Sequence, residues 1–108
     1  MDTELLRKFS DQQLRRIVEE AFVYMCACPA QVAEQILKLR GLFAYQQSCI
    51  DQGPVSAKVH RMIAASTARA HADLEGCLED ILTLEGWDMD SLSMPEGLRE
   101  LRAKDLDD

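Results

Sequence analysis

The sequence predicts an all-α protein, an antiparallel helical bundle of three main helices with a short C-terminal helical arm. Apolar residues recur at steps of three and four through three long segments. Capping or proline signals separate these segments, and no stretch shows the alternation of a β-strand. Because 108 residues is the length of one domain, we expect a single helical domain over residues 1–108.

The first helix is predicted over residues 10–27, after an N-terminal lead-in over residues 1–9. The Ser10 side chain can cap the amide of Gln13, whose own side chain can reach back, forming a capping box. Phe9 and Leu14 occupy the two positions of a hydrophobic staple. The apolar positions that follow repeat at a helical period and predict one buried face: Leu14, Ile17, Val18, Ala21, Phe22 and Met25.

The second helix is predicted over residues 29–51, because Pro29 disfavours helical geometry before it and suits the first helical position. Cys28 is then the cap residue. One apolar stripe and one stripe of small and apolar residues lie on two sides of this helix, so we expect it to be central. The first stripe is Val32, Ile36, Leu39, Phe43 and Ile50, and the second is Ala33, Leu37, Gly41, Ala44 and Ser48.

The third helix is predicted over residues 54–85, about 45 Å long at 1.5 Å per residue. Gly53 can end the preceding helix and Pro54 can begin this one. Gly86 can supply a left-handed C-terminal residue, which lets Trp87 fold back onto the last turn. The expected core stripe is Val59, Met62, Ile63, Ser66, Ala70, Leu74, Cys77, Ile81 and Leu84.

A short C-terminal helix is predicted over residues 93–103, where Ser93 and Glu96 have the spacing of a second capping box. Residues 104–108 form an acidic tail that we expect to be frayed.

Charge and composition argue against several kinds of partner. The formal net charge is −7 and the basic residues are dispersed, which disfavours nucleic acid and anionic membranes. The N-terminal residues lack the apolar region of a secretory signal, and no apolar run approaches the roughly 20 residues of a membrane span. We therefore expect a cytoplasmic protein with four reduced cysteines. No phosphate-binding loop or catalytic motif is present, so we predict no enzymatic activity, no catalytic residue and no cofactor.

Three cysteines form the one group that invites a chemical hypothesis. If the second and third helices make an antiparallel hairpin, Cys28 faces a position near residue 76, which brings Cys26, Cys28 and Cys77 to one end of the bundle. Cys49 would lie roughly 30 Å from Cys28, at the other end. Three thiols could exchange a disulfide or bind a soft metal, and a helix N-terminus lowers the pKa of a thiol such as Cys28. The spacing does not predict a zinc site, and the alternative is that Cys77 is a small core residue.

Other candidate sites have simpler explanations. His60 and His71 lie about three helical turns apart and cannot bind one ion together, so surface or flank positions are expected. Asp88-x-Asp90 fails as a calcium loop because the later ligand positions do not match. The acidic pairs Glu19/Glu20 and Glu79/Asp80 are expected on solvated faces.

The leading hypothesis is a protein-interaction or regulatory module that acts through helix surfaces as a homodimer. Each of Gly41 and Gly76 costs a helix about 1 kcal/mol relative to alanine, which the close approach of another backbone would explain. The long third helix should overshoot its neighbour and leave apolar positions such as Leu78 and Leu82 to be covered. Intramolecular neighbours filling these grooves are the alternative. The second hypothesis is a redox or soft-metal sensor that uses Cys26, Cys28 and Cys77.

Overall fold

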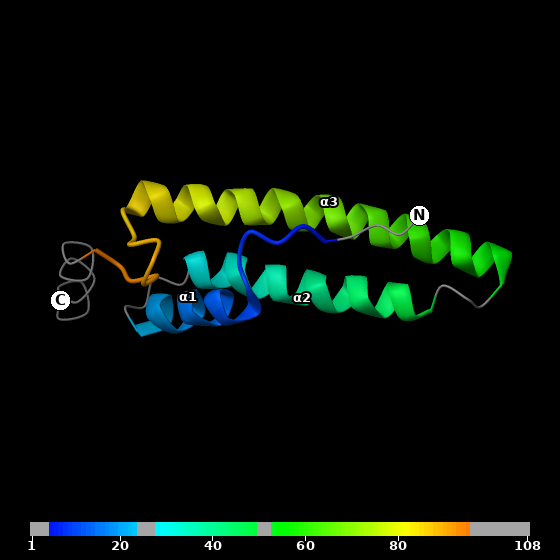
Figure 1. Ribbon diagram of the computed structural model, residues 1–108, viewed down its shortest axis with the longest axis horizontal. Helices are drawn as coiled ribbons and strands as arrows, with labels where there is room; N and C mark the ends of the chain where they lie inside the picture. Colours follow the sequence, from blue (N-terminus) through cyan, green and yellow to red (C-terminus); the bar gives the residue numbers. More distant parts are fainter. Residues whose placement is uncertain (1–4, 24–27, 50–52, 96–108) are drawn as a thin grey trace.

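The computed structural model describes residues 5–23, 28–49 and 53–95 and confirms the helical fold (Figure 1). Helix α1 spans Asp11–Val23, α2 spans Cys28–Ser48 and α3 spans Pro54–Glu85. Within these described ranges there is no β-strand, and the one isolated β-bridge joins Asp88 to Ser93. The observed α3 has the predicted bounds, and residues 24–27 at the predicted end of the first helix lie outside the described residues.

Helices α2 and α3 form an antiparallel hairpin, and α1 packs against α2 (Figure 1). The first turns of α2 and the last turns of α3 lie at the same end of this hairpin, where α1 is also found. The predicted antiparallel arrangement is therefore correct. The start of α3 and the end of α2 extend beyond α1 at the opposite end (Figure 1).

The start of α1 forms as the sequence predicts. The Ser10 backbone N–H donates to Gln13 Oε1 at 2.8 Å, and the Gln13 N–H donates to Ser10 Oγ at 3.0 Å. This reciprocal capping box satisfies two donors that would otherwise lack a helical acceptor. Phe9 and Leu14, the predicted staple residues, are both buried in the core.

The apolar core lies at the end of the hairpin that α1 covers. All three helices and the segment after α3 contribute to it. Its fully buried side chains include Leu14, Ile17, Ile36, Leu78 and Leu82. The other buried members are Phe9, Ala21, Ala30, Ala33, Trp87, Leu92 and Met94. Leu78 and Leu82 are thus covered within the chain, so the prediction that they need an external partner is wrong.

The end of α3 follows its predicted capping geometry. Gly86 adopts a left-handed conformation with φ of 77°, and its N–H donates to the carbonyl of Thr83 at 3.1 Å. The Trp87 N–H donates back to the carbonyl of Leu82 at 2.9 Å, a pairing that closes the helix and returns Trp87 to the core.

The segment after Trp87 packs on α1 as a turn. The Met94 N–H donates to Glu20 Oε2 at 2.8 Å, and the same carboxylate pairs with Arg16 at 3.4 Å. Glu20 is therefore buried and bonded, which corrects its predicted place on a solvated face. Residues 93–95 are not helical, and the remainder of the predicted 93–103 helix, with the Glu96 partner of its capping box, lies outside the described residues.

Residues 5–10, here called the N-terminal strap, run along the α2–α3 hairpin before entering α1 (Figure 1). The backbone N–H groups of Lys8 and Phe9 donate to Glu75 Oε2 of α3 at 2.9 and 3.1 Å. These two bonds tie the strap to a helix that is more than 60 residues away in sequence. The sequence predicts only a lead-in here, so this contact is new.

The buried face of α3 differs from the predicted one. Its buried residues follow a helical period that includes three polar side chains: Ala64, Thr67, His71, Glu75, Leu78 and Leu82. Most of the predicted core stripe is exposed instead, namely Val59, Met62, Ile63, Ser66, Ala70, Cys77 and Leu84. Leu74 and Ile81 are half-buried. The physical reason is that each of the polar residues on the buried face has a partner, which offsets the cost of burying it. Thr67 donates to the Ile63 carbonyl. His71 and Glu75 accept from Arg40 of α2, and Glu75 also accepts from the strap.

The predicted stripes of α2 are also only partly buried. Ala33 and Ile36 are fully buried, whereas the other described members of both stripes are half-buried or exposed. Ile50 lies outside the described residues. An added Cβ at Gly41 or Gly76 would meet nothing within 4 Å, so no close intramolecular approach explains these glycines. The structure instead buries Arg40, which lies one turn after Ile36.

Candidate functional site

The structure describes two of the three cysteines of the thiol hypothesis, and both are exposed. Cys28 is the first residue of α2 and is exposed. Cys77 is exposed on α3, so its alternative role as a small core residue is wrong. Cys49 lies half-buried just after α2, at the far end of the hairpin from Cys28. Cys26 lies outside the described residues, and the juxtaposition of all three thiols therefore stays a prediction.

No group of three or more His, Cys, Asp or Glu side chains among the described residues is placed to hold a metal ion. The sensor hypothesis is tested by counting the reactive thiols of the reduced protein with and without a chelator, alongside a metal analysis.

A buried polar cluster joins both hairpin helices to the strap. We call Arg40, His71 and Glu75 the buried triad, because each is nearly inaccessible to solvent. The Arg40 guanidinium donates from Nε to His71 Nε2 at 3.0 Å and from one terminal nitrogen to Glu75 Oε2 at 3.0 Å. It also donates to the Phe9 carbonyl at 2.6 Å and to the Asp11 carboxylate. One arginine thus connects α2, α3, the strap and the start of α1.

The hydrogen bonds of the triad fix the protonation of His71. Its Nε2 accepts a hydrogen bond from Arg40 Nε–H, so the neutral ring carries its proton on Nδ1, which lies 3.6 Å from Glu75 Oε1. Burial lowers the pKa of His71 below its usual value, Glu75 opposes this shift, and Arg40 adds to it. The hydrogen bond from Arg40 likewise lowers the pKa of Asp11. His71 is therefore a neutral hydrogen-bond acceptor, and its predicted surface position is wrong.

The triad has a structural role, because its polar groups form hydrogen bonds with one another and with the backbone. Glu75 Oε2 alone accepts from two backbone amides and from Arg40. Sequence reasoning missed these residues by treating the arginine as one of several dispersed bases. A signal existed: Arg40 continues the buried line of Ala33 and Ile36, and His71 and Glu75 precede Leu78 and Leu82 at helical spacing.

We expect the stability of the protein to fall as the pH drops below about 6.5, the usual pKa of an unfolded histidine. The lowered pKa of folded His71 means that the unfolded chain binds this proton first, so protonation favours unfolding. The slope is at most about 1.4 kcal/mol per pH unit and applies between 6.5 and the folded pKa. Urea unfolding at pH 7.5 and 5.5 measures it, because the lowered pKa of Asp11 keeps that group out of this window.

The variant His71→Gln keeps an acceptor for Arg40 but removes the titration, so its unfolding free energy should lose most of this pH dependence. His60→Gln is the matched control, because His60 is half-buried and bonded to Gln46. Equal pH slopes for wild type and His71→Gln would contradict the assignment.

An apolar surface on α3 is the second notable feature. We define the open face as the exposed and half-exposed stripe that runs the length of this helix: Val55, Val59, Met62, Ile63, Ser66, Ala70, Asp73, Cys77, Asp80, Ile81 and Leu84. At 100° per residue these positions fall within about 100° of one another, so they share one side of the helix. Along the length of α3 this side presents apolar side chains to solvent, where a buried stripe was expected.

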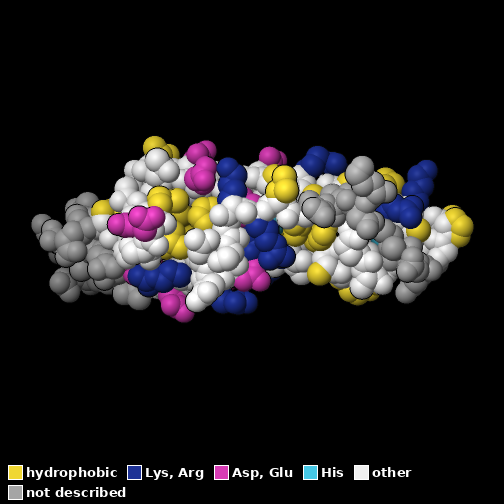
Figure 2. Space-filling model, in the orientation of Figure 1, with side chains coloured by type: hydrophobic (Ala, Val, Ile, Leu, Met, Phe, Trp, Pro, Cys, Tyr) yellow, Lys and Arg dark blue, Asp and Glu magenta, His cyan; other side chains and the backbone are white. Residues whose placement is uncertain are grey.

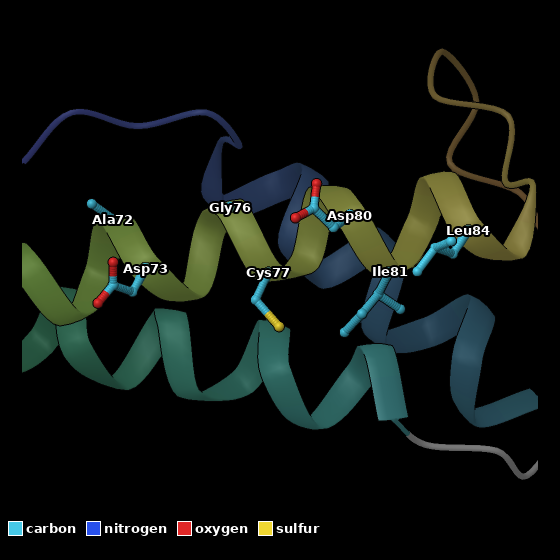
Figure 3. A pocket seen from close by; sticks show the side chains of 7 residues that line it. All are labelled: Ala72, Asp73, Gly76, Cys77, Asp80, Ile81 and Leu84. Carbon is cyan, nitrogen blue, oxygen red and sulfur yellow. The ribbon is translucent and has the colours of Figure 1, made fainter.

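Two shallow hollows mark the open face. One, of about 650 Å³, is lined by α3 alone, and Figure 3 shows Cys77 and Ile81 projecting from the same side of the helix with Asp73 and Asp80 at its rim. The other, of about 450 Å³, lies between α2 and the first half of α3. Its α2 wall is Leu39 and Leu42, and its α3 wall includes Met62 and Ile63.

The strap and α1 cover a different side of the hairpin. Figure 2 shows that side, on which charged side chains surround smaller apolar areas. The His71 and Glu75 positions that contact the strap are buried, whereas Cys77, two residues further along α3, is exposed. The strap and the open face are therefore on separate sides of α3.

None of the described helices has the length and apolarity to cross a lipid bilayer. Comparisons of the chain with protein-family models, curated proteins and solved structures found no significant match.

Proposed function

We propose that this protein is a helical protein-interaction module that self-associates through the open face of α3. The observation that carries the proposal is the choice of buried face. Helix α3 buries three polar side chains, Thr67, His71 and Glu75, and leaves a stripe with many apolar side chains exposed to solvent. Exposed fractions of 62% at Met62 and 86% at Leu84 leave large apolar surfaces in water. Single exposed apolar residues are ordinary, but a continuous stripe is typical of an interaction surface.

The size of this surface suits a second copy of the chain. A stripe about 45 Å long and about 10 Å wide offers roughly 450 Å² from α3 alone. The neighbouring α2 adds Leu42, which is 41% exposed and lines a hollow together with Met62 and Ile63. The sum, roughly 500 Å² per copy, falls in the range of weak complexes, which bury less than about 1,200 Å² in total, and it suits association at micromolar concentration. Two hairpins that pack in this way would complete a helical bundle with a shared apolar core.

A reducing cytoplasmic setting suits the exposed thiols of Cys28 and Cys77. We propose that compartment, and we propose no catalytic role for the chain.

Light scattering over a wide range of protein concentration tests self-association. The monomer mass is 12.2 kDa, and we expect the measured mass to approach twice this value as the concentration rises through the micromolar range. A folded protein that keeps the monomer mass at every concentration would contradict the proposed function.

A further inference from the structure

The charges of α3 are segregated along its length. The first half of the helix contains Lys58, Arg61 and Arg69 and no acidic residue. The second half contains five acidic residues, among them Asp73 and Asp80 on the open face, and no basic residue. Along the upper edge of Figure 2, the right-hand part of α3 accordingly shows Lys and Arg side chains without Asp or Glu.

The opposite charges also lie on one edge of the stripe. At 100° per residue, Lys58, Arg69, Asp73 and Asp80 fall within about 60° of one another around α3. All four are exposed, so they can form bonds across an interface. The apolar residues Val59 and Cys77 lie about 40° beyond Asp73, toward the middle of the stripe, and Ile81 lies at its other edge.

A two-fold interface brings the same edge of both copies together when the two helices run antiparallel, and then pairs the basic half of one with the acidic half of the other. A parallel two-fold arrangement would put the charged edges on opposite sides of the interface, with basic halves level with each other and acidic halves level with each other, so no attraction between opposite charges would form. Since the charge reverses between Arg69 and Asp73, the two-fold axis should pass close to Ala70. The small side chains of Ser66 and Ala70 permit close approach at that point.

We propose that a second copy of this chain occupies the open face in an antiparallel arrangement centred near Ala70. This inference rests on the proposed function and adds the orientation and register of the partner. Position i of one copy then lies near position 140 − i of its partner, as an approximate register. Asp80 lies at the level of residue 60 of the second copy, near its Lys58, and Asp73 lies beside its Arg69.

Disulfide trapping tests the orientation. In the antiparallel register the two Cys77 residues lie about 21 Å apart, because 14 residues separate their levels along the helix. Two thiols introduced by Ala70→Cys would lie near the axis, within the roughly 7 Å between α-carbons that a disulfide requires. After mild oxidation at a concentration that gives the dimer mass, peptide mapping should show a 70–70 link in Ala70→Cys and no 77–77 link in the wild type.

Charge reversal provides a second readout. Asp80→Lys should raise the dimer dissociation constant about tenfold at low salt, because it replaces two symmetric attractions by two repulsions. Adding Lys58→Asp to the same chain should restore most of the affinity, and high salt should reduce both effects. The matched control is Asp90→Lys, because Asp90 is an exposed acid outside α3 and should leave the constant unchanged.

The outcomes separate the two proposals. A dimer that forms a 77–77 link without a 70–70 link, or that is indifferent to Asp80→Lys, overturns the antiparallel register and leaves self-association standing. A monomer mass at all concentrations overturns the proposed function itself. A 70–70 link with rescue by Lys58→Asp supports both.

Discussion

Replacement of Arg40 by methionine should lower the free energy of unfolding by about 3–5 kcal/mol, the range observed when one partner of a buried ion pair is removed. Methionine preserves much of the apolar stem of arginine, so the loss isolates the guanidinium. Without it, the Glu75 carboxylate, at 1% exposure, would keep the two strap amides and the neighbouring His71 ring but lose its arginine cation. Urea denaturation followed by circular dichroism measures the change.

Arg15→Met provides the matched control, because Arg15 is exposed on α1, and its effect should stay within about 0.5 kcal/mol. The double variant Arg40→Met with Glu75→Leu should recover part of the loss, since it removes the unpaired charge as well. If Arg40→Met proves as mild as Arg15→Met, the triad does not hold the strap to the hairpin.

Met62→Lys should weaken self-association about 100-fold, equivalent to roughly 2.7 kcal/mol. Both copies would bring an ammonium group into the apolar part of the interface, and the cost of removing each group from water exceeds what the partner's Asp80, about two residues from its level, can return. Met62 is 62% exposed within the chain, so the monomer should keep its fold and its helical circular dichroism. Sedimentation equilibrium gives the dissociation constants.

Leu6→Lys is the control for this prediction. Leu6 is 81% exposed in the strap, away from the open face, and its replacement should leave the dissociation constant within about twofold. Equal weakening by both variants would show that the open face has no special part in association.

The start of α1 and both ends of α3 could be predicted from the sequence, because local chemistry determines them, whereas α2 ends at Ser48 and not at the predicted residue 51. The Ser10–Gln13 capping box, the Gly53–Pro54 start and the left-handed Gly86 each involve residues within a few positions of one another. Their hydrogen bonds form whatever the rest of the chain does, so a sequence pattern is enough to predict them.

The buried face of α3 could not be predicted in the same way. Hydrophobic periodicity favours the stripe through Met62 and Leu84 over the one through His71 and Glu75, because it counts a histidine or glutamate as polar whatever its partners. The hydrogen bonds from Arg40 and from the strap lower the free-energy cost of burying His71 and Glu75, and a sequence pattern does not show these tertiary contacts.

The candidate sites show the same limit. The sequence predicts the helix on which Cys77 lies and the end of the hairpin where it is found. Its exposure, however, depends on which side of α3 faces the rest of the chain. The sequence predicts a homodimer partly from Leu78 and Leu82, which are buried within the chain. The structure supplies a different and larger surface for the same proposal.

The alkylation rate of Cys77 tests most directly whether a second copy covers the open face. Cys77 is exposed in the isolated chain and lies in the middle of that face. The rate at which a small alkylating reagent, added in excess, modifies the Cys77 thiol therefore reports whether the face is covered. Peptide mass spectrometry should show alkylation slowing about tenfold between dilute and concentrated wild-type protein, and staying constant in Met62→Lys. A Cys77 rate that is the same at every concentration, in a wild-type protein that remains folded, would contradict the account.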